Sequence, residues 1–460
     1  MRNDHPTLFG QPIDRRTLLT MTGKVLAGGT VAGVWLGPDM AGFVEAAAHG
    51  RKTGGSVTVT SQFTPPGPAK WQSYFDAFTK ETGISVTLDD QNANNQYQKI
   101  ATEGQSGGHS YDVVSIDTIW SGSFGRAGFT LDLTDFLPAS VKGKIAPPAL
   151  ASVAYQGKLY GVPAFNSSKH FYYNKQMLDS VGLHHPPATL DDLLSYCATL
   201  KSNQAKLGII APMSAPWMQA ENLTCDYVDF VDAHGGRFFA ADNATPLFNH
   251  GAGVQALQFM VTLLKKGYMA PGSLTHGGGD TEKDLLSGKT AMCTRWEGVM
   301  TDSLNPAQAT PAVRGHIRLA LIPGSPARKS GSCLGPQGWA IMKGSRHQAE
   351  AKAFLNWWIS TAAQKQGMLQ FDQYPIYTAL YTDPSLRKLV AQSDGVDDFP
   401  IYGQQFAFAQ PRPNFPGYLD ASKRLQIHLQ KALLGQETPQ QALNAAAAEM
   451  KAASTGGSNP

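Results

Sequence analysis

The first part of the chain alternates between strand and helix patterns, and this alternation restricts the fold more than any other feature. Short β-branched or apolar runs at 56–60, 84–88 and 111–116 predict three strands. The intervening segments, 69–82 and 92–103, carry apolar residues at helical spacing and predict two helices. Strand, helix, strand, helix, strand in this order is typical of a parallel sheet in an α/β protein.

The 460 residues of the chain exceed one ordinary domain, since domains average about 150 residues. A hairpin at 151–174 predicts a first crossing of the chain between two lobes. Thr189, followed by two aspartates, predicts the start of a helix. We expect further helices at 189–201, 217–233, 251–266, 280–287, 346–363 and 419–434, strands at 290–294, 317–322 and 338–342, and a disordered tail at 452–460.

The charge pattern argues against a nucleic-acid-binding protein. The formal net charge is +3, only 16% of residues are charged, and no run of five like charges occurs. Nucleic acid would require a basic stripe, which is missing. We therefore expect no nucleic-acid partner.

The N-terminal 48 residues have the features of an export signal. Arg15 and Arg16 precede a weakly apolar, glycine-rich stretch over 21–36, and Ala46–Ala48 supplies a small-residue cleavage site. This arrangement resembles a twin-arginine signal peptide, spanning residues 1–48, in which the paired arginines are read by a receptor. No cysteine occurs before Cys197, so we expect a soluble periplasmic product without a lipid anchor.

Four cysteines, Cys197, Cys225, Cys293 and Cys333, leave the disulfide pattern open. An even number in an oxidising compartment permits two bridges, and neighbour pairing, Cys197–Cys225 with Cys293–Cys333, is the simplest arrangement. The alternative is buried free thiols, which export of an already folded protein would favour. Their spacing does not fit a structural zinc site, so we expect no metal.

Several short motifs follow one another in an order that resembles a known family. The segment Tyr111–Asp117 with Trp120 is followed by Gly157–Pro163 (GKLYGVP) and Tyr172–Lys175 (YYNK), and then by Leu286–Met292 with Trp296. Later matches are Leu321–Gly324, Gly338–Ile341, Glu350–Phe354, Pro411–Pro413 and Gly417–Tyr418. Together they resemble the family 1 extracellular solute-binding proteins of ABC importers, the maltose-binding-like group, over nearly all of 55–450.

The resemblance implies an α/β, two-lobed periplasmic-binding-protein fold of type II, or Venus flytrap. Its lobes are joined by crossing strands and close on a ligand. We expect the N-terminal lobe to comprise 55–162 and about 325–375, and the C-terminal lobe 163–324 and about 376–450. The resemblance also implies a monomer that delivers its ligand to the membrane permease subunits of an ABC importer, with no cofactor.

A sugar ligand requires polar side chains for its hydroxyls and aromatic rings for its C–H faces. For two of the candidate ligand residues an alternative role stays open: Asp117 as a helix N-cap and Arg412 as a hinge contact. Trp71, Trp357 and Trp358 lie at helical spacing among apolar residues and are expected in the core. The candidate ligand residues follow predicted strands, lie in later loops or, for Trp217, open a predicted helix: Gln62, Asn95, Asp117, Trp120, Asn166, Trp217, Trp296, Glu297, Tyr374 and Arg412.

Other functions are weaker interpretations of the same sequence. No Gly-x-Ser-x-Gly elbow, His-Glu-x-x-His helix or Walker loop occurs, so we expect no enzyme activity, although paired carboxylates of a secreted carbohydrate-active enzyme stay open. A glycerophosphodiester is an alternative ligand, because Arg295 and Arg412 suit a phosphate. The partner is either a permease or a sensor.

Overall fold

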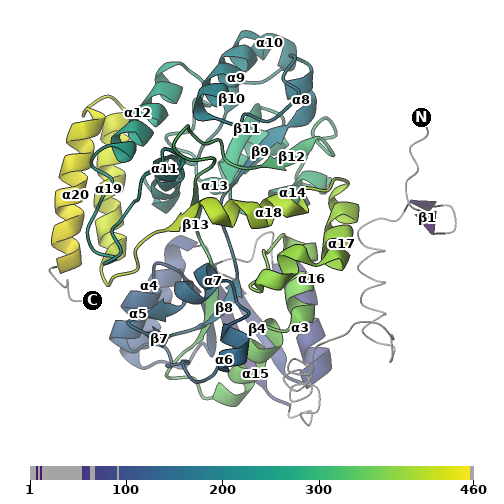
Figure 1. The fold of residues 1–460 in the computed structure, drawn as a ribbon. Coiled ribbons are helices and arrows are strands. Elements are labelled where there is room, and N and C mark those ends of the chain that lie inside the picture. The colour runs from purple at the N-terminus through teal and green to yellow at the C-terminus, as the bar shows by residue number, and fades with distance from the viewer. Residues whose placement is uncertain (1–6, 9–10, 13–53, 63–67, 91–92, 456–460) are drawn as a thin grey trace.

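The computed structural model describes residues 7–8, 11–12, 54–62, 68–90 and 93–455, and these residues form two lobes around two separate sheets (Figure 1). Most of the predicted signal peptide, 1–48, lies outside the described residues. Within it, only the short strands β1 (Thr7–Leu8) and β2 (Gln11–Pro12) are described.

The first lobe is built on a five-stranded sheet of order β4-β3-β5-β14-β8. Parallel pairing of β3 with β4 and β5 confirms the predicted strand–helix alternation, while β14 runs antiparallel to both β5 and β8. Every residue of β5 except its last is buried, as a central strand requires. The strands are β3 (Ser56–Ser61), β4 (Ser85–Asp90), β5 (Val113–Asp117), β8 (Val162–Phe165) and β14 (Gln337–Ile341).

Helices cover this sheet, and one of them differs from its prediction. The expected helix at 346–363 is two helices, because Ser360 begins a new one by accepting a hydrogen bond from the Ala363 backbone N–H at 3.2 Å. The helices of this lobe are α3 (Pro68–Thr82), α4 (Ala93–Ser106), α5 (Ser121–Ala127), α6 (Ala139–Lys142), α7 (Pro147–Ser152), α15 (Gln348–Trp358) and α16 (Thr361–Phe371), and its hairpin is β6 (Ala154–Tyr155) with β7 (Lys158–Leu159).

The second lobe is built on a four-stranded sheet of order β10-β11-β9-β12. Its helix α9 starts at a capping box: the Thr189 hydroxyl accepts a hydrogen bond from the Asp192 N–H, and the Asp192 carboxylate accepts one from the Thr189 N–H. The predicted start of this helix is therefore confirmed. Its strands are β9 (His170–Asn174), β10 (Ala211–Met213), β11 (Thr290–Arg295) and β12 (Ile317–Ala320), and its helices α8 (Lys175–Asp179), α9 (Leu190–Ser202), α10 (Gln204–Leu207), α11 (Glu221–Ala233), α12 (Ala252–Lys265), α13 (Gly278–Leu286) and α14 (Val299–Leu304).

The chain passes between the lobes several times. It crosses from β8 to β9, and returns from β12 to β14 through β13 (Ser332–Leu334), which pairs in parallel with β15 (Ala409–Pro411). Figure 1 shows β13 at the level where the two lobes meet. Between α16 and β15 lie η1 (Thr378–Thr382), α17 (Pro384–Asp394), α18 (Phe399–Gln405) and η2 (Phe406–Phe408).

The chain ends in two helices that pack on the second lobe, α19 (Tyr418–Leu433) and α20 (Pro439–Thr455). In Figure 1 this yellow pair lies beside α12. The expectation of a disordered tail from 452 is wrong for 452–455, which continue α20 because Ala442, Ala446 and Met450 bury one face of that helix. Residues 456–460 lie outside the described part.

Aromatic packing fills the core of the first lobe. Trp71 stacks on Phe371 with ring centroids 4.0 Å apart and on Trp358 at 5.9 Å. Trp71, Trp357 and Trp358 are buried, which confirms their expected core role. In the described part of the chain, no helix has the length and apolar character needed to cross a membrane.

The four cysteines are free and buried, so the neighbour pairing Cys197–Cys225 with Cys293–Cys333 is wrong and the alternative of free thiols holds. Cys333 instead lies within hydrogen-bonding reach of Cys225, because α11 packs against β13. Burial raises the pKa of the Cys293 thiol to about 12, which keeps it protonated.

Candidate functional site

Polar side chains gather where β3 and β5 end. Gln62 follows β3 directly, and Asp117 is the last residue of β5; parallel neighbours bring their carboxyl ends to one edge of the sheet. The Gln62 amide donates to Asp117 Oδ2 at 3.4 Å and to Gln337 Oε1 at 3.1 Å. Gln337 lies opposite Asp117 in the register of β14 with β5. The structure therefore brings two predicted site residues into contact.

Arg412 joins this edge to the second lobe. Its Nη2 lies 3.5 Å from Asp117 Oδ1 in the first lobe, and its Nη1 donates to Glu221 Oε1 at 2.9 Å at the start of α11. Only 3% of the Arg412 side chain is exposed. Burial raises the pKa of the Asp117 carboxyl, and the nearby guanidinium opposes this shift. Arg412 thus contacts both lobes, as its hinge interpretation requires.

Glu221 is a central residue of this site that the sequence analysis missed. Besides Arg412, three side chains donate to its carboxylate: Tyr418 at 2.9 Å, Ser422 at 2.6 Å and Gln426 at 3.2 Å. These donors come from α19, which packs against α11. The one sequence signal for Glu221 was its place near Trp217, in the first turns of the helix predicted at 217–233.

Asn414 makes a second connection between the lobes, two residues beyond Arg412. Its Nδ2 donates to Ser121 Oγ at 2.9 Å and to the Ala154 carbonyl at 3.0 Å, both in the first lobe, while its Oδ1 accepts from Asn243 in the second lobe at 2.7 Å. We call residues 412–414 the bridging segment. Its backbone lies so close to α5 that a Cβ added at Gly122 would be 1.8 Å from the Asn414 carbonyl oxygen.

Trp296 and Glu297 lie at the end of β11 in the second lobe. The Trp296 indole N–H donates to Asn222 Oδ1 at 3.1 Å, and a Cβ added at Gly335 would be 2.5 Å from its ring. Glu297 Oε2 accepts from the Ser167 hydroxyl on the crossing segment at 2.5 Å. Burial raises the pKa of Glu297 to about 7, although this hydrogen bond lowers it.

Beneath Trp296, the crossing segment places a buried lysine against α11. Lys169 pairs with Asp226 and, at 3.0 Å, with Asp229, and its Nζ lies 6.0 Å from the Trp296 ring centroid. Asp229 also accepts a hydrogen bond from the Cys333 N–H at 2.7 Å. Burial raises the pKa of Asp229, and Lys169 opposes the shift. These ion pairs tie α11 to two crossing strands.

The remaining predicted residues take other positions. Trp120 is buried against Tyr97, with ring centroids 5.6 Å apart, and Asn95 lies in the first turn of α4. Trp217 is 1% exposed, and its indole N–H donates to Asp226 at 2.9 Å. Buried Asn166 and Tyr374 bridge to each other on the crossing segments, where the Tyr374 hydroxyl lies 3.2 Å from His170 Nδ1. Ligand contact by these five residues stays a prediction.

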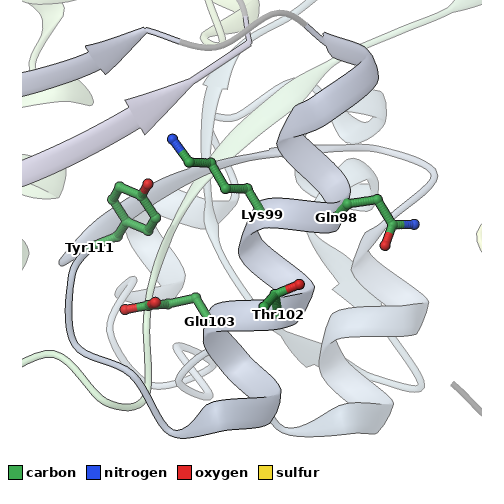
Figure 2. Close-up of a pocket in the computed structure, with 5 residues that line it drawn as sticks. All are labelled: Gln98, Lys99, Thr102, Glu103 and Tyr111. Atoms are coloured by element: carbon green, nitrogen blue, oxygen red, sulfur yellow. The ribbon is translucent and has the colours of Figure 1, made fainter.

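A metal site and a surface pocket are two further kinds of candidate site. Across the described residues, no group of three or more His, Cys, Asp or Glu side chains is arranged to hold a metal ion. A surface depression of about 450 Å³ lies along α4, lined by Gln98, Lys99, Thr102, Glu103 and Tyr111 (Figure 2). Lys99 and Tyr111 are both bonded there to Asp89, at 2.8 and 2.7 Å. None of the predicted ligand residues lines this depression.

Comparison with known proteins agrees with this architecture. Residues 64–365 match the family model described as bacterial extracellular solute-binding protein. The probable ABC transporter-binding protein of Deinococcus radiodurans is 25% identical over 323 residues, which is 68% of this chain and 74% of the relative. A mannitol-binding protein of Pseudomonas aeruginosa is 27% identical over 272 residues, 58% of this chain and 60% of the relative.

Among solved structures, maltose-bound MalE3 of T. maritima superposes with a TM-score of 0.76 at 24% identity and covers 86% of this chain and 99% of that one. This likeness identifies the fold as the two-lobed type II arrangement expected from the sequence. The family match spans well over half of the 460 residues. The chain therefore belongs to the bacterial extracellular solute-binding protein family.

Proposed function

We propose that this protein is the substrate-binding component of an ABC importer, which captures a carbohydrate or polyol between its lobes and delivers it to a membrane permease. The observation that carries the proposal is the junction itself. In one lobe Gln62 contacts Asp117, which pairs with Arg412; in the other, Glu221 pairs with Arg412 and its neighbour Asn222 accepts a hydrogen bond from Trp296. A ligand held by both groups would hold the lobes together.

The chemistry of this junction suits a hydroxyl-rich ligand. Carboxylates and amides at Asp117, Glu297, Gln62 and Gln337 supply acceptors and donors for hydroxyls, and the half-buried Trp296 ring offers a face for sugar C–H groups. The printed names of a mannitol-binding relative and a maltose-bound structural neighbour fit this ligand class. Their family supports binding and transport in place of catalysis.

The remaining sequence predictions complete the proposal. We keep residues 1–48 as a twin-arginine signal peptide and the mature protein as a periplasmic monomer without a lipid anchor. We keep the lobe division, 55–162 with about 325–375 and 163–324 with about 376–450, except that β8 carries the first segment of the N-terminal lobe on to Phe165. The ends of the crossing segments would then flex as the lobes close.

A thermal-shift screen of the mature protein against sugars, polyols and phosphodiesters tests the function. A ligand at 100 times its Kd stabilises the folded protein by about 2.7 kcal/mol, which raises Tm by a few degrees. Chromatography of the recovered ligand distinguishes a receptor, which leaves it unaltered, from a carbohydrate-active enzyme. The proposal fails if no sugar or polyol raises Tm, or if the ligand is converted.

A further inference from the structure

The positive charge of Arg412 is already neutralised within the protein. Its Nη1 donates to Glu221 at 2.9 Å, the ordinary length of a strong charged hydrogen bond. Glu221 in turn has four side-chain donors, two on each oxygen, which matches the acceptor capacity of a carboxylate. Glu221 is therefore the closer partner of Arg412, and Asp117 is a second, more distant one, so that two carboxylates face a single guanidinium.

Asp117 is in the opposite situation, because all its side-chain contacts are long. Its oxygens lie 3.3 Å from the Ile119 N–H, 3.4 Å from the Gln62 amide and 3.5 Å from Arg412. Normal N–H···O hydrogen bonds are about 2.9 Å, so this carboxylate keeps acceptor capacity for further donors. Its side chain is 17% exposed, so a ligand can reach it. The raised pKa of Asp117 agrees with incomplete compensation of its charge.

The neighbouring cations are also paired. Arg295, next to Trp296, donates to Glu282 at 2.7 Å, and Lys169 pairs with Asp226 and Asp229. Each of these cations thus has its own carboxylate, whereas Asp117 has only the 3.5 Å contact to Arg412, a guanidinium that it shares with Glu221. A phosphate placed at this junction would meet negative charge, and a hydroxyl would meet an acceptor.

We propose that Asp117 is a specificity-determining residue that selects uncharged, hydroxyl-rich ligands and rejects their phosphorylated forms. This inference rests on the proposed function and decides between its two ligand classes, since it argues against the glycerophosphodiester. The Asp117 carboxylate accepts hydroxyl protons from a neutral ligand. It repels the oxygens of a phosphate, which are mostly deprotonated at neutral pH and carry like charge.

Matched pairs of probes test this selection by titration calorimetry: D-mannitol with D-mannitol 1-phosphate, maltose with maltose 1-phosphate, and glycerol with sn-glycerol 3-phosphate. In each pair that binds, we expect the neutral member to bind on the order of 100-fold tighter, since like charges in contact strongly disfavour association. Asp117→Asn keeps the side-chain shape and removes the charge. We expect it to reduce this ratio at least about tenfold.

Asp132→Asn is the control, because it makes the same change in net charge at an exposed residue that pairs with Lys158. It should leave the ratio unchanged. If the phosphate member binds as tightly as the neutral one, or if Asp117→Asn leaves the ratio unchanged, the selection is overturned while the receptor function stands. If no neutral probe binds and only phosphates do, both the inference and the carbohydrate assignment fail.

Discussion

Gly122 offers the sharpest test of the interlobe contacts, because its replacement by alanine changes one atom at the bridging segment. A Cβ at this position would lie 1.8 Å from the Asn414 carbonyl oxygen, whereas real Cβ atoms stay beyond 3.0 Å. The bridging segment would have to move away from α5 by about 1.2 Å. A shift of this size lengthens the bonds from Asn414 to Ser121 and Ala154, now 2.9 and 3.0 Å, beyond hydrogen-bonding range.

Overpacking of a close contact costs about 1–3 kcal/mol, which corresponds to a loss of affinity of about 5- to 150-fold if the ligand requires the same arrangement of lobes. Alanine is a better helix former than glycine by about 1 kcal/mol, so the substitution stabilises α5 itself in either arrangement of the lobes. We therefore expect Gly122→Ala to weaken ligand binding without lowering Tm in the absence of ligand. Titration calorimetry with the ligand found by thermal shift measures the first effect, and calorimetric unfolding the second.

Gly279→Ala is the matched control, because Gly279 also lies in a helix and an added Cβ there meets nothing within 4 Å. It should bind ligand like the wild type. Small-angle scattering of the liganded Gly122→Ala protein should show a larger radius of gyration than that of the control. The reasoning is refuted if Gly122→Ala binds within about twofold of wild type and has the same radius of gyration.

Other substitutions and conditions test separate parts of the structure. Trp296→Ala should weaken binding by about 1–3 kcal/mol in calorimetry, and a change within about twofold would remove it from the site. Arg412→Gln should lower the free energy of unfolding in urea by about 3 kcal/mol, because Glu221 loses its cation. Arg387 forms an exposed ion pair with Asp397, so Arg387→Gln should change the free energy of unfolding by less than about 1 kcal/mol. Burial raises the folded-state pKa of Asp232 to about 7, above its unfolded value near 4, so the folded state binds the proton more tightly. Tm should therefore fall as pH rises from about 4 to 7. Asp232→Asn should flatten this dependence, and a Tm that rises over this range would contradict the prediction. Arg15→Lys with Arg16→Lys should retain the precursor in the cytoplasm on fractionation, and unchanged export would contradict the signal assignment.

The sequence predicted the features that depend on local patterns. The strands and helices of 56–117 follow from period-2 and period-3.6 spacing, and Thr189 marked the start of α9 because its capping partner is three residues away. The break at Ser360 was missed, since a cap inside an apolar periodic stretch is a weak signal. No helix was predicted at the position of α20, because the stability of this helix comes from packing against α19.

The site was predicted less completely, because its contacts join distant parts of the chain. Asp117 and Gln62 could be placed together, since the ends of parallel neighbouring strands share an edge. Glu221 contacts Arg412 across 191 residues, and no spacing in the sequence indicates that pair. Trp217 was predicted to open a helix, and the bond from its indole N–H to Asp226 on α11 could not be predicted from the sequence.

The bridging segment indicates how the lobes would separate. Pro411 and Pro413 fix the backbone on either side of Arg412, and β15 is paired with β13, so the segment moves as a stiff unit. At Arg412 the second-lobe contact is the shorter one, 2.9 Å to Glu221 against 3.5 Å to Asp117. At Asn414 the bond to Asn243 in the second lobe, 2.7 Å, is likewise shorter than those to Ser121 and Ala154 in the first, 2.9 and 3.0 Å. The contacts to Asp117, Ser121 and Ala154 are therefore those that opening would break, which leaves Asp117 free to accept an incoming hydroxyl.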